Sequence, residues 1–131
     1  MTTPTELHFT FDGKAIDANV DQLIIAGWTG RDTAAVEEHI AELETIGVAR
    51  PAATPCFYRA SASLLTQAPS IQALGANSSG EAECFILAAA GDLWVGVGSD
   101  HTDRKVEAFD VAVSKQMCAK PVGANLWRHA D

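Results

Sequence analysis

The segment from Gly80 to Arg104 constrains the fold most, because it has the pattern of a β-hairpin that carries acidic side chains. Apolar stretches rich in β-forming residues flank Gly91-Asp92, a glycine-first pair typical of a two-residue turn. With that turn, Glu83 is expected directly across from Asp100. Glu81 lies two residues before Glu83 and therefore projects from the same face of the strand. The sequence predicts three carboxylates on one face of a hairpin.

Carboxylates placed this close together repel one another, and the repulsion requires compensation. Opposed Cβ atoms of paired strands are only ~4.5–5.5 Å apart. Like charges at that separation destabilise a sheet unless a raised pKa or a bound cation neutralises them. Carboxylate oxygens are hard ligands that suit Mg²⁺ or Mn²⁺. Glu81, Glu83 and Asp100 are therefore candidate metal ligands, and a solvated acidic face of a hairpin is the alternative.

Composition and charge limit the classes of protein and partner. The 131 residues, 47% of them hydrophobic and 20% charged, indicate a single globular domain over 1–131. The formal net charge of −8 disfavours a nucleic acid or an anionic membrane as partner, and fits a cation or a small molecule. The N-terminal residues have no signal-peptide pattern, and three scattered cysteines argue against a disulfide framework. We therefore expect a cytoplasmic protein.

Outside the acidic segment, hydrophobic periodicity predicts both strands and helices. Asp12-Gly13 lies between alternating apolar stretches and predicts a first hairpin, and Leu23 to Trp28 is expected to form a buried strand. The clearest helix begins after Thr29 or Asp32 and ends at Gly47. Its apolar residues follow the i, i+4, i+7 spacing of one helix face: Val36, Ile40 and Leu43.

The C-terminal part of the chain is expected to contain one further helix and an unpaired end. The spacing of apolar residues from Val106 to Met117 suits a single helix. Gly123 to Asp131 contain no helix stop and are expected to pair with no strand. The sequence therefore predicts an α+β fold that is incomplete at its C-terminus.

His39 and Glu42 are candidates for a catalytic pair, since they stand i, i+3 on the predicted helix. A carboxylate beside an imidazole orients the ring and raises its basicity, which suits a histidine that activates water. A helix-edge histidine with an incidental acidic neighbour is the alternative.

Three cations follow Asp100 and are candidates for binding a negatively charged substrate. Arg104 comes about one helical turn after Asp100 and could clamp a substrate carboxylate in bidentate fashion. Lys120 could stabilise an oxyanion or enolate, with Lys115 as a rival for that role. For each of them the alternative is an ordinary surface cation.

Four motifs together resemble the fumarylacetoacetate hydrolase family over about 30–120. They are Gly30-Arg31 before His39-x-x-Glu42, a proline-rich loop before Phe57-Tyr58-Arg59, Glu81-x-Glu83, and Asp100-x-x-x-Arg104 followed by Lys120. The chain departs from the family in a short stretch between Glu83 and Asp100 and in Glu107, where the family has glutamine. The C-terminal part of the family's sheet is also absent.

The resemblance implies a mixed β-roll or barrel-like sheet with a short lid helix. It also implies an enzyme in which Mg²⁺ or Mn²⁺, held by the three acids, acts on a small 2-oxo acid or 1,3-dicarbonyl compound through a metal-stabilised enolate. His39, held by Glu42, would activate water for C–C bond hydrolysis, and Lys120 would stabilise the enolate. Arg59 and Arg104 would bind the substrate.

Other outcomes are compatible with the same residues. The family also contains decarboxylases, isomerases and hydratases that would use the same metal-enolate site. A non-catalytic truncated binding domain is a further alternative. The resemblance also implies a homodimer.

Overall fold

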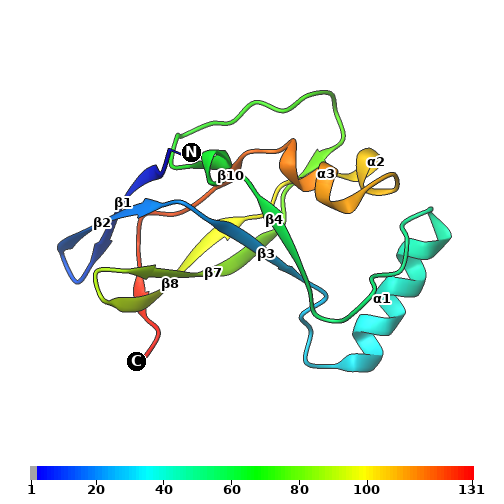
Figure 1. Cartoon of the computed structure of the whole chain (residues 1–131), viewed down its shortest axis with the longest axis horizontal. Coiled ribbons are helices and arrows are strands. Elements are labelled where there is room, and N and C mark those ends of the chain that lie inside the picture. Colours follow the sequence, from blue (N-terminus) through cyan, green and yellow to red (C-terminus); the bar gives the residue numbers. More distant parts are fainter. Residues whose placement is uncertain (1–2) are drawn as a thin grey trace.

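The computed structural model describes residues 3–131 and has a mixed α+β fold composed mostly of strands (Figure 1). The strands are β1 (Thr5–Phe11), β2 (Lys14–Val20), β3 (Leu23–Gly27), β4 (Cys56–Ala60), β5 (Leu65–Thr66), β6 (Ser78–Ser79), β7 (Ala82–Ala89), β8 (Asp92–Ser99), β9 (Thr102–Asp103), β10 (Lys120–Pro121) and β11 (Trp127–Arg128). The helices are α1 (Thr33–Thr45), α2 (Arg104–Glu107), α3 (Val111–Gln116) and the 3₁₀ turn Ala62–Leu64.

The strands form several small sheets. β11, β8 and β7 make a three-stranded sheet, and the others pair as β1-β2, β3-β4, β5-β10 and β6-β9. Among these strand pairs of residues 3–131, β5-β10 is parallel and the others are antiparallel. Within residues 3–131 these sheets do not close into a barrel. The prediction of an α+β fold is thus confirmed in outline.

The first hairpin forms as predicted. β1 and β2 pair from Thr5–Val20 to Phe11–Lys14 and leave Asp12-Gly13 as the turn. Both turn residues have left-handed backbone angles, with φ of 49° and 72°. This turn geometry matches the right-handed twist of the strands that it joins.

The second hairpin forms, but its predicted turn and register are wrong. The turn is Ala90-Gly91, with φ of 51° and 72°, and Glu81 rather than Glu83 lies across from Asp100. Moving the turn by one residue displaces the pairing by two positions. Because side chains alternate along a strand, a two-position displacement leaves every side chain on its predicted face. The acids therefore stay together despite the wrong register.

Core packing explains the observed register. Leu87 pairs directly with Trp94, and both side chains are buried in the main core cluster. Phe85 lies across from Gly96, where a Cβ atom would come within 2.2 Å of the phenyl ring. The left-handed conformation of Ala90 costs roughly 1–2 kcal/mol, which the packing of these side chains offsets.

The core lies between the two hairpins and is completed by the C-terminal segment. Its buried members come from β1, β2, β7, β8 and the segment before β11: Leu7, Phe9, Ala18, Leu87, Trp94 and Leu126. The expectation that Gly123 to Asp131 would pair with no strand is wrong. Trp127 and Arg128 pair with β8, and the backbone N–H of Leu126 donates a hydrogen bond to the backbone oxygen of Thr10.

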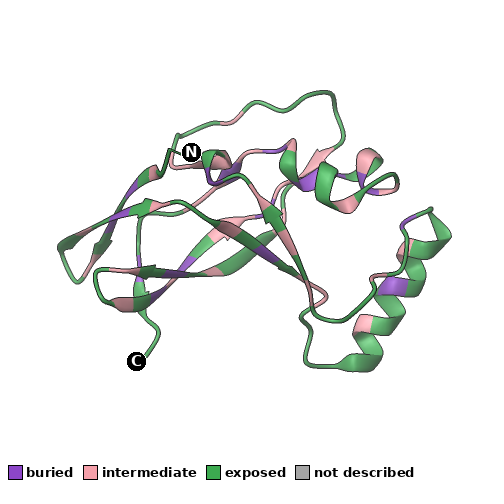
Figure 2. Cartoon of the chain, viewed as in Figure 1, coloured by how far each residue is buried: buried purple, intermediate pink, exposed green. Residues whose placement is uncertain are grey.

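Helix α1 forms as predicted and projects from the end of the molecule opposite the two hairpins (Figure 1). Asp32 caps it by accepting hydrogen bonds from the backbone N–H groups of Ala34 and Ala35. The chain leaves the helix through Gly47, whose φ is 96°. Ile40 is its buried residue, and the rest of α1 is largely exposed (Figure 2).

The single helix predicted between Val106 and Met117 is instead two short helices. Asp103 caps α2, and Asp110 starts α3 by accepting a hydrogen bond from the backbone N–H of Val113. A second cap inside the predicted helix begins a new helix, because its side chain satisfies backbone N–H groups that would otherwise lack partners. No helix among the described residues has the length and apolar character needed to span a membrane.

Candidate metal centre and its cation network

The three predicted acids meet at the open end of the β7-β8 hairpin. Glu81 precedes β7, Glu83 lies within β7, and Asp100 follows β8. One carboxylate oxygen from each lies within 4.8 Å of the others. Asp100 is buried, with 7% of its surface exposed, whereas Glu81 is half-buried and Glu83 is exposed. The structure thus gathers the candidate ligands around one deeply placed carboxylate.

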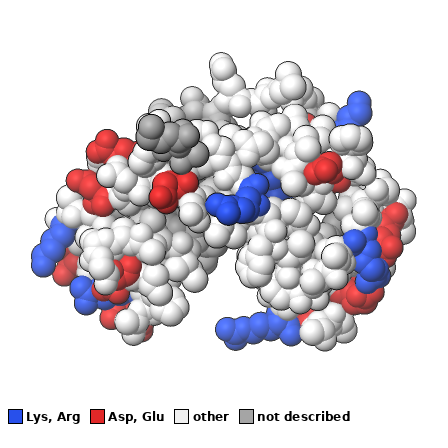
Figure 3. Space-filling model, in the orientation of Figure 1, with Lys and Arg blue, Asp and Glu red and all other residues white. Residues whose placement is uncertain are grey.

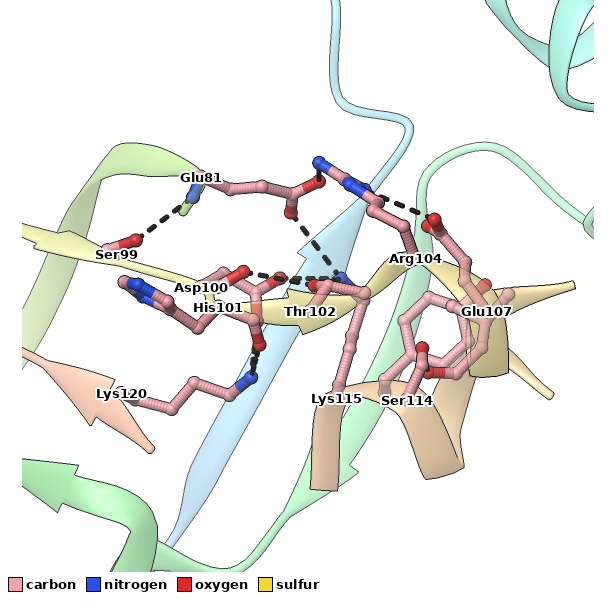
Figure 4. Close-up of polar contacts among 12 residues, drawn as sticks. Glu81, Ser99, Asp100, His101, Thr102, Arg104, Glu107, Ser114, Lys115 and Lys120 are labelled. Carbon is pink, nitrogen blue, oxygen red and sulfur yellow. Dashed lines mark hydrogen bonds and ion pairs between the residues drawn. The ribbon is translucent and has the colours of Figure 1, made fainter. Parts of the chain in front are cut away.

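The Asp100 carboxylate lies between two buried lysines (Figure 4). Lys115 Nζ donates a hydrogen bond to Asp100 Oδ2 at 2.6 Å. Lys120 Nζ lies 2.9 Å from Asp100 Oδ1 and also donates to the backbone oxygen of His101. The Lys120 contact with Oδ1 is an ion pair without hydrogen-bond geometry, so this buried oxygen has no hydrogen-bond partner among the described residues.

These lysines determine the ionisation of Asp100. Burial alone would raise the pKa of its carboxyl group, but the contacts with Lys115 and Lys120 outweigh burial and hold that pKa below its ordinary value. Asp100 is therefore a carboxylate at neutral pH.

Arg104 joins the cluster from the first turn of α2. Its guanidinium pairs with Glu81 at 2.7 Å and with Glu107 at 3.1 Å. Burial by itself would lower the pKa of Arg104, but the two carboxylates outweigh it and raise that pKa. Glu107 is buried and holds the Arg104 guanidinium through this contact. Arg104 is positioned beside the acids as predicted.

Glu83 differs from its neighbours because it has no ion pair within residues 3–131. Although much of the Glu83 surface is exposed, its carboxyl group is partly shielded from water, and this shielding, followed by the charges of Asp100 and Glu81, raises its pKa. Lys115 and Lys120 only partly oppose this effect. The repulsion expected from the sequence is therefore concentrated at Glu83.

A cavity of about 460 Å³, which we call the cavity below α1, separates the cluster from that helix. Its walls include Glu81, Arg104 and Lys115 on one side and His39 on the other. His39 Nδ1 lies 3.8 Å from Glu42 Oε2, and both side chains are exposed, at 62% and 70%. The predicted pair is thus close in space, and His39 lines the cavity that separates α1 from the cluster.

Aromatic side chains form the wall between β3 and α1. The Trp28 and His39 rings lie 5.7 Å apart, and Trp28 Nε1 donates to the Tyr58 hydroxyl at 3.4 Å. Trp28 has a left-handed φ of 61°, an uncommon conformation for a bulky residue. This backbone conformation places the indole against the cavity that His39 lines.

A second cavity, of about 400 Å³, lies on the other side of the acids. Glu83, Asp100 and Lys120 line one part of it, and the remainder is mostly apolar, with side chains from β3 and β7 such as Ile24 and Ile86. Charged groups on the face in Figure 3 lie toward the hairpin end, toward α1 and at the centre, with an indentation below the centre. The two cavities together border all three acids.

Arg59 is a predicted site residue that the structure brings neither to the cluster nor to a cavity wall, and Glu42 likewise lines neither of the two cavities. Arg59 is exposed on β4. Its neighbour Tyr58 lines the cavity below α1, and side chains alternate along a strand, so Arg59 faces away. Its predicted role in substrate binding therefore has no support from its position.

The sequence does not predict the structural roles of two residues of the cluster, Lys115 and Glu107. Lys115 was expected only as a rival of Lys120, yet both bind Asp100. Glu107 appeared only as a departure from the family pattern. The i, i+3 spacing of Arg104 and Glu107 on α2 was the available signal for the second of these contacts.

Fold and site together define a mixed α+β protein with a candidate metal centre at the end of a β-hairpin. Residues 26–131 match a family described as "Protein of unknown function (DUF2848)", and the chain belongs to this family. No curated protein and no solved structure matches the chain.

Asp100→Asn is expected to lower the free energy of unfolding by roughly 3–5 kcal/mol, because it leaves buried ammonium groups without their counter-charge. Urea unfolding measures the loss. Asp21→Asn makes the same chemical change at an exposed position and should stay within about 0.5 kcal/mol of wild type. A loss below about 1 kcal/mol at Asp100 would contradict the central place given to this carboxylate.

Glu83→Gln is expected to stabilise the metal-free protein at pH 7. Because the folded-state pKa of Glu83 is raised, the folded protein binds more protons than the unfolded chain between the ordinary and raised pKa values. Stability from this group therefore falls as pH rises through that window. Replacing Glu83 removes the free-energy cost of ionising this group in the folded protein. The gain in stability of the variant over wild type should therefore shrink as the pH is lowered through the window.

Thermal unfolding in EDTA between pH 4 and pH 8 measures this difference, which should reach about a few degrees at most because Glu83 is exposed. Glu38→Gln, on the exposed surface of α1, is the matched control. A Glu83→Gln protein that is less stable than wild type at pH 7 would show that the repulsion is absent.

Proposed function

We propose that this protein is a metal-dependent enzyme that hydrolyses a C–C bond in a small 2-oxo acid or 1,3-dicarbonyl compound. The observation that carries the proposal is the placement of Glu81, Glu83 and Asp100 oxygens within 4.8 Å of one another, between two cavities. The resemblance to the fumarylacetoacetate hydrolase family supports the same reading. We propose on that basis that the sheets are related to that family's β-roll, with α1 as its lid helix.

The donor set suits Mg²⁺ or Mn²⁺. All three residues offer hard carboxylate oxygens, one of which, Asp100 Oδ1, is buried and has an ion pair with Lys120 but no hydrogen-bond partner among residues 3–131. Glu83 also carries a charge that no ion pair in this part of the chain offsets. A bound divalent cation would act as a Lewis acid toward the oxo and carboxylate oxygens of the substrate.

The cations of the cluster would bind the substrate and stabilise its negative charge. Arg104 lines the cavity below α1, and its pairing with Glu81 and Glu107 holds the guanidinium in place. It could therefore receive a substrate carboxylate with little loss of side-chain freedom. Lys120 approaches from the second cavity and could stabilise an enolate oxygen.

His39 would activate water. Its Nδ1 faces Glu42, which leaves Nε2 as the atom to accept a proton from water. The water oxygen would form a bond to the distal carbonyl carbon, and the C–C bond would break with its electron pair retained by the departing enolate. The proton held by His39 would then return to the enolate carbon. Water is thus consumed, and atoms and electrons balance.

A decarboxylase of a 2-oxo acid is the second candidate function. The acids, Arg104 and Lys120 are closely packed, whereas His39 and Glu42 are exposed and 3.8 Å apart. The groups that would stabilise an enolate are therefore better assembled than the groups that would activate water. Loss of CO₂ forms an enolate without any attack by water.

Assays with acetylpyruvate and oxaloacetate, each with and without Mn²⁺, test the proposal. Hydrolysis of acetylpyruvate should require Mn²⁺ and should fall by about 10²–10⁴ in His39→Gln, the range typical of a lost general base. Glu38→Gln, one residue away on α1, is the matched control and should retain activity. Mn²⁺-dependent loss of CO₂ that is insensitive to His39→Gln would favour the decarboxylase, and inactivity on both compounds would reject both candidates.

A further inference from the structure

Lys115 has no role in the proposed reaction, yet it occupies one side of the candidate metal centre. Only 6% of its surface is exposed. Its Nζ lies 2.6 Å from Asp100 Oδ2 and 3.7 Å from Glu81 Oε2, and it donates to Thr102 Oγ1 at 3.3 Å (Figure 4). Its ammonium group thus contacts oxygens of two of the three candidate ligands.

We propose that Lys115 is an internal cation that competes with the divalent metal for Asp100 and Glu81. Metal binding would displace its ammonium group toward the cavity below α1, where it would pair with a carboxylate of the substrate. This inference rests on the metal centre of the proposed function and adds a residue that couples metal binding to substrate binding.

Competition follows from the positions and charges of these groups. A lone pair that accepts a hydrogen bond from an ammonium group is not free to bind a metal. A metal bound to the same carboxylates would also be repelled by the charge of the neighbouring Lys115 ammonium group. Lys115 Nζ lies 2.6 Å from Asp100 Oδ2 and 3.7 Å from Glu81 Oε2, so its ammonium group occupies the side from which a metal would reach these two carboxylates.

Lys120 is placed differently and can remain where it is. Its Nζ contacts Asp100 Oδ1 and the backbone oxygen of His101, and it lines the second cavity. Asp100 would therefore keep one ammonium partner after Lys115 leaves. This arrangement limits the cost of displacing Lys115, because no buried carboxylate loses all of its cations.

The displaced ammonium group would have a suitable destination. Lys115 already lines the cavity of about 460 Å³, together with Arg104 and His39. An anionic substrate in that cavity would then meet two cations, Arg104 and Lys115. We therefore expect metal to bind before an anionic substrate, and Lys115 to act as a positioning residue for the substrate carboxylate.

Mn²⁺ titration followed by electron paramagnetic resonance of the free ion, without substrate, tests the competition. Lys115→Met should bind Mn²⁺ about tenfold or more tightly than wild type, because it removes a charge that repels the metal. Lys105→Met removes an exposed charge from α2 and should bind like wild type. Equal or weaker binding by Lys115→Met would overturn the inference.

The outcomes separate this inference from the proposed function. Absence of Mn²⁺ binding in both wild type and Lys115→Met would reject the metal centre itself. Binding by wild type without any gain in the variant would reject only the competition. Binding by the variant alone would support both the site and the internal cation.

Amine labelling of the wild-type protein gives a second readout that does not depend on the folding of a variant. Acetic anhydride should modify Lys115 several-fold faster at saturating Mg²⁺ than in EDTA, whereas Lys120 should change little. Mass spectrometry of the digested protein measures both rates. An unchanged rate at Lys115 with the metal bound would show that its ammonium group is not displaced.

Discussion

The burial of the Asp100 carboxylate between Lys115 and Lys120 is the interaction on which the rest of the site depends. Buried charges are tolerated when they are paired. Removing one partner costs free energy of folding, because it leaves the remaining charge buried and uncompensated. This contact joins the residue that follows β8 to α3 and β10. The same groups therefore tie α3 and β10 to the end of the hairpin and define the charge of the candidate centre.

Much of the local structure could be predicted from the sequence. Asp12-Gly13 signals its turn directly, and Asp32 and Gly47 mark the ends of α1. The turn at Ala90-Gly91 could not be predicted in the same way, because alanine rarely adopts a left-handed conformation. That turn follows from the pairing of Leu87 with Trp94 in the core, which is a tertiary constraint. The pairing of β11 with β8 is likewise a contact between distant segments.

Both the acids and the cations of the candidate site could be named from the sequence, but only the arrangement of the acids could be predicted. Strand alternation alone brings Glu81, Glu83 and Asp100 to one face, even when the register is wrong. The lysine contacts depend on how α3 and β10 pack against β8, for which the local sequence holds no signal. The sequence therefore assigns the cations to a substrate, whereas the structure shows Arg104, Lys115 and Lys120 paired with the carboxylates themselves. Glu83 alone among the three retains the predicted repulsion.

The most direct test of the central claim is X-ray diffraction from crystals grown with Mn²⁺, with data collected near the manganese absorption edge. The account predicts an anomalous difference peak bonded to at least one carboxylate oxygen from each of Glu81, Glu83 and Asp100. A cluster without a peak at saturating Mn²⁺, with Lys115 and Lys120 still paired to Asp100, would contradict it and would leave these residues a structural ion-pair network.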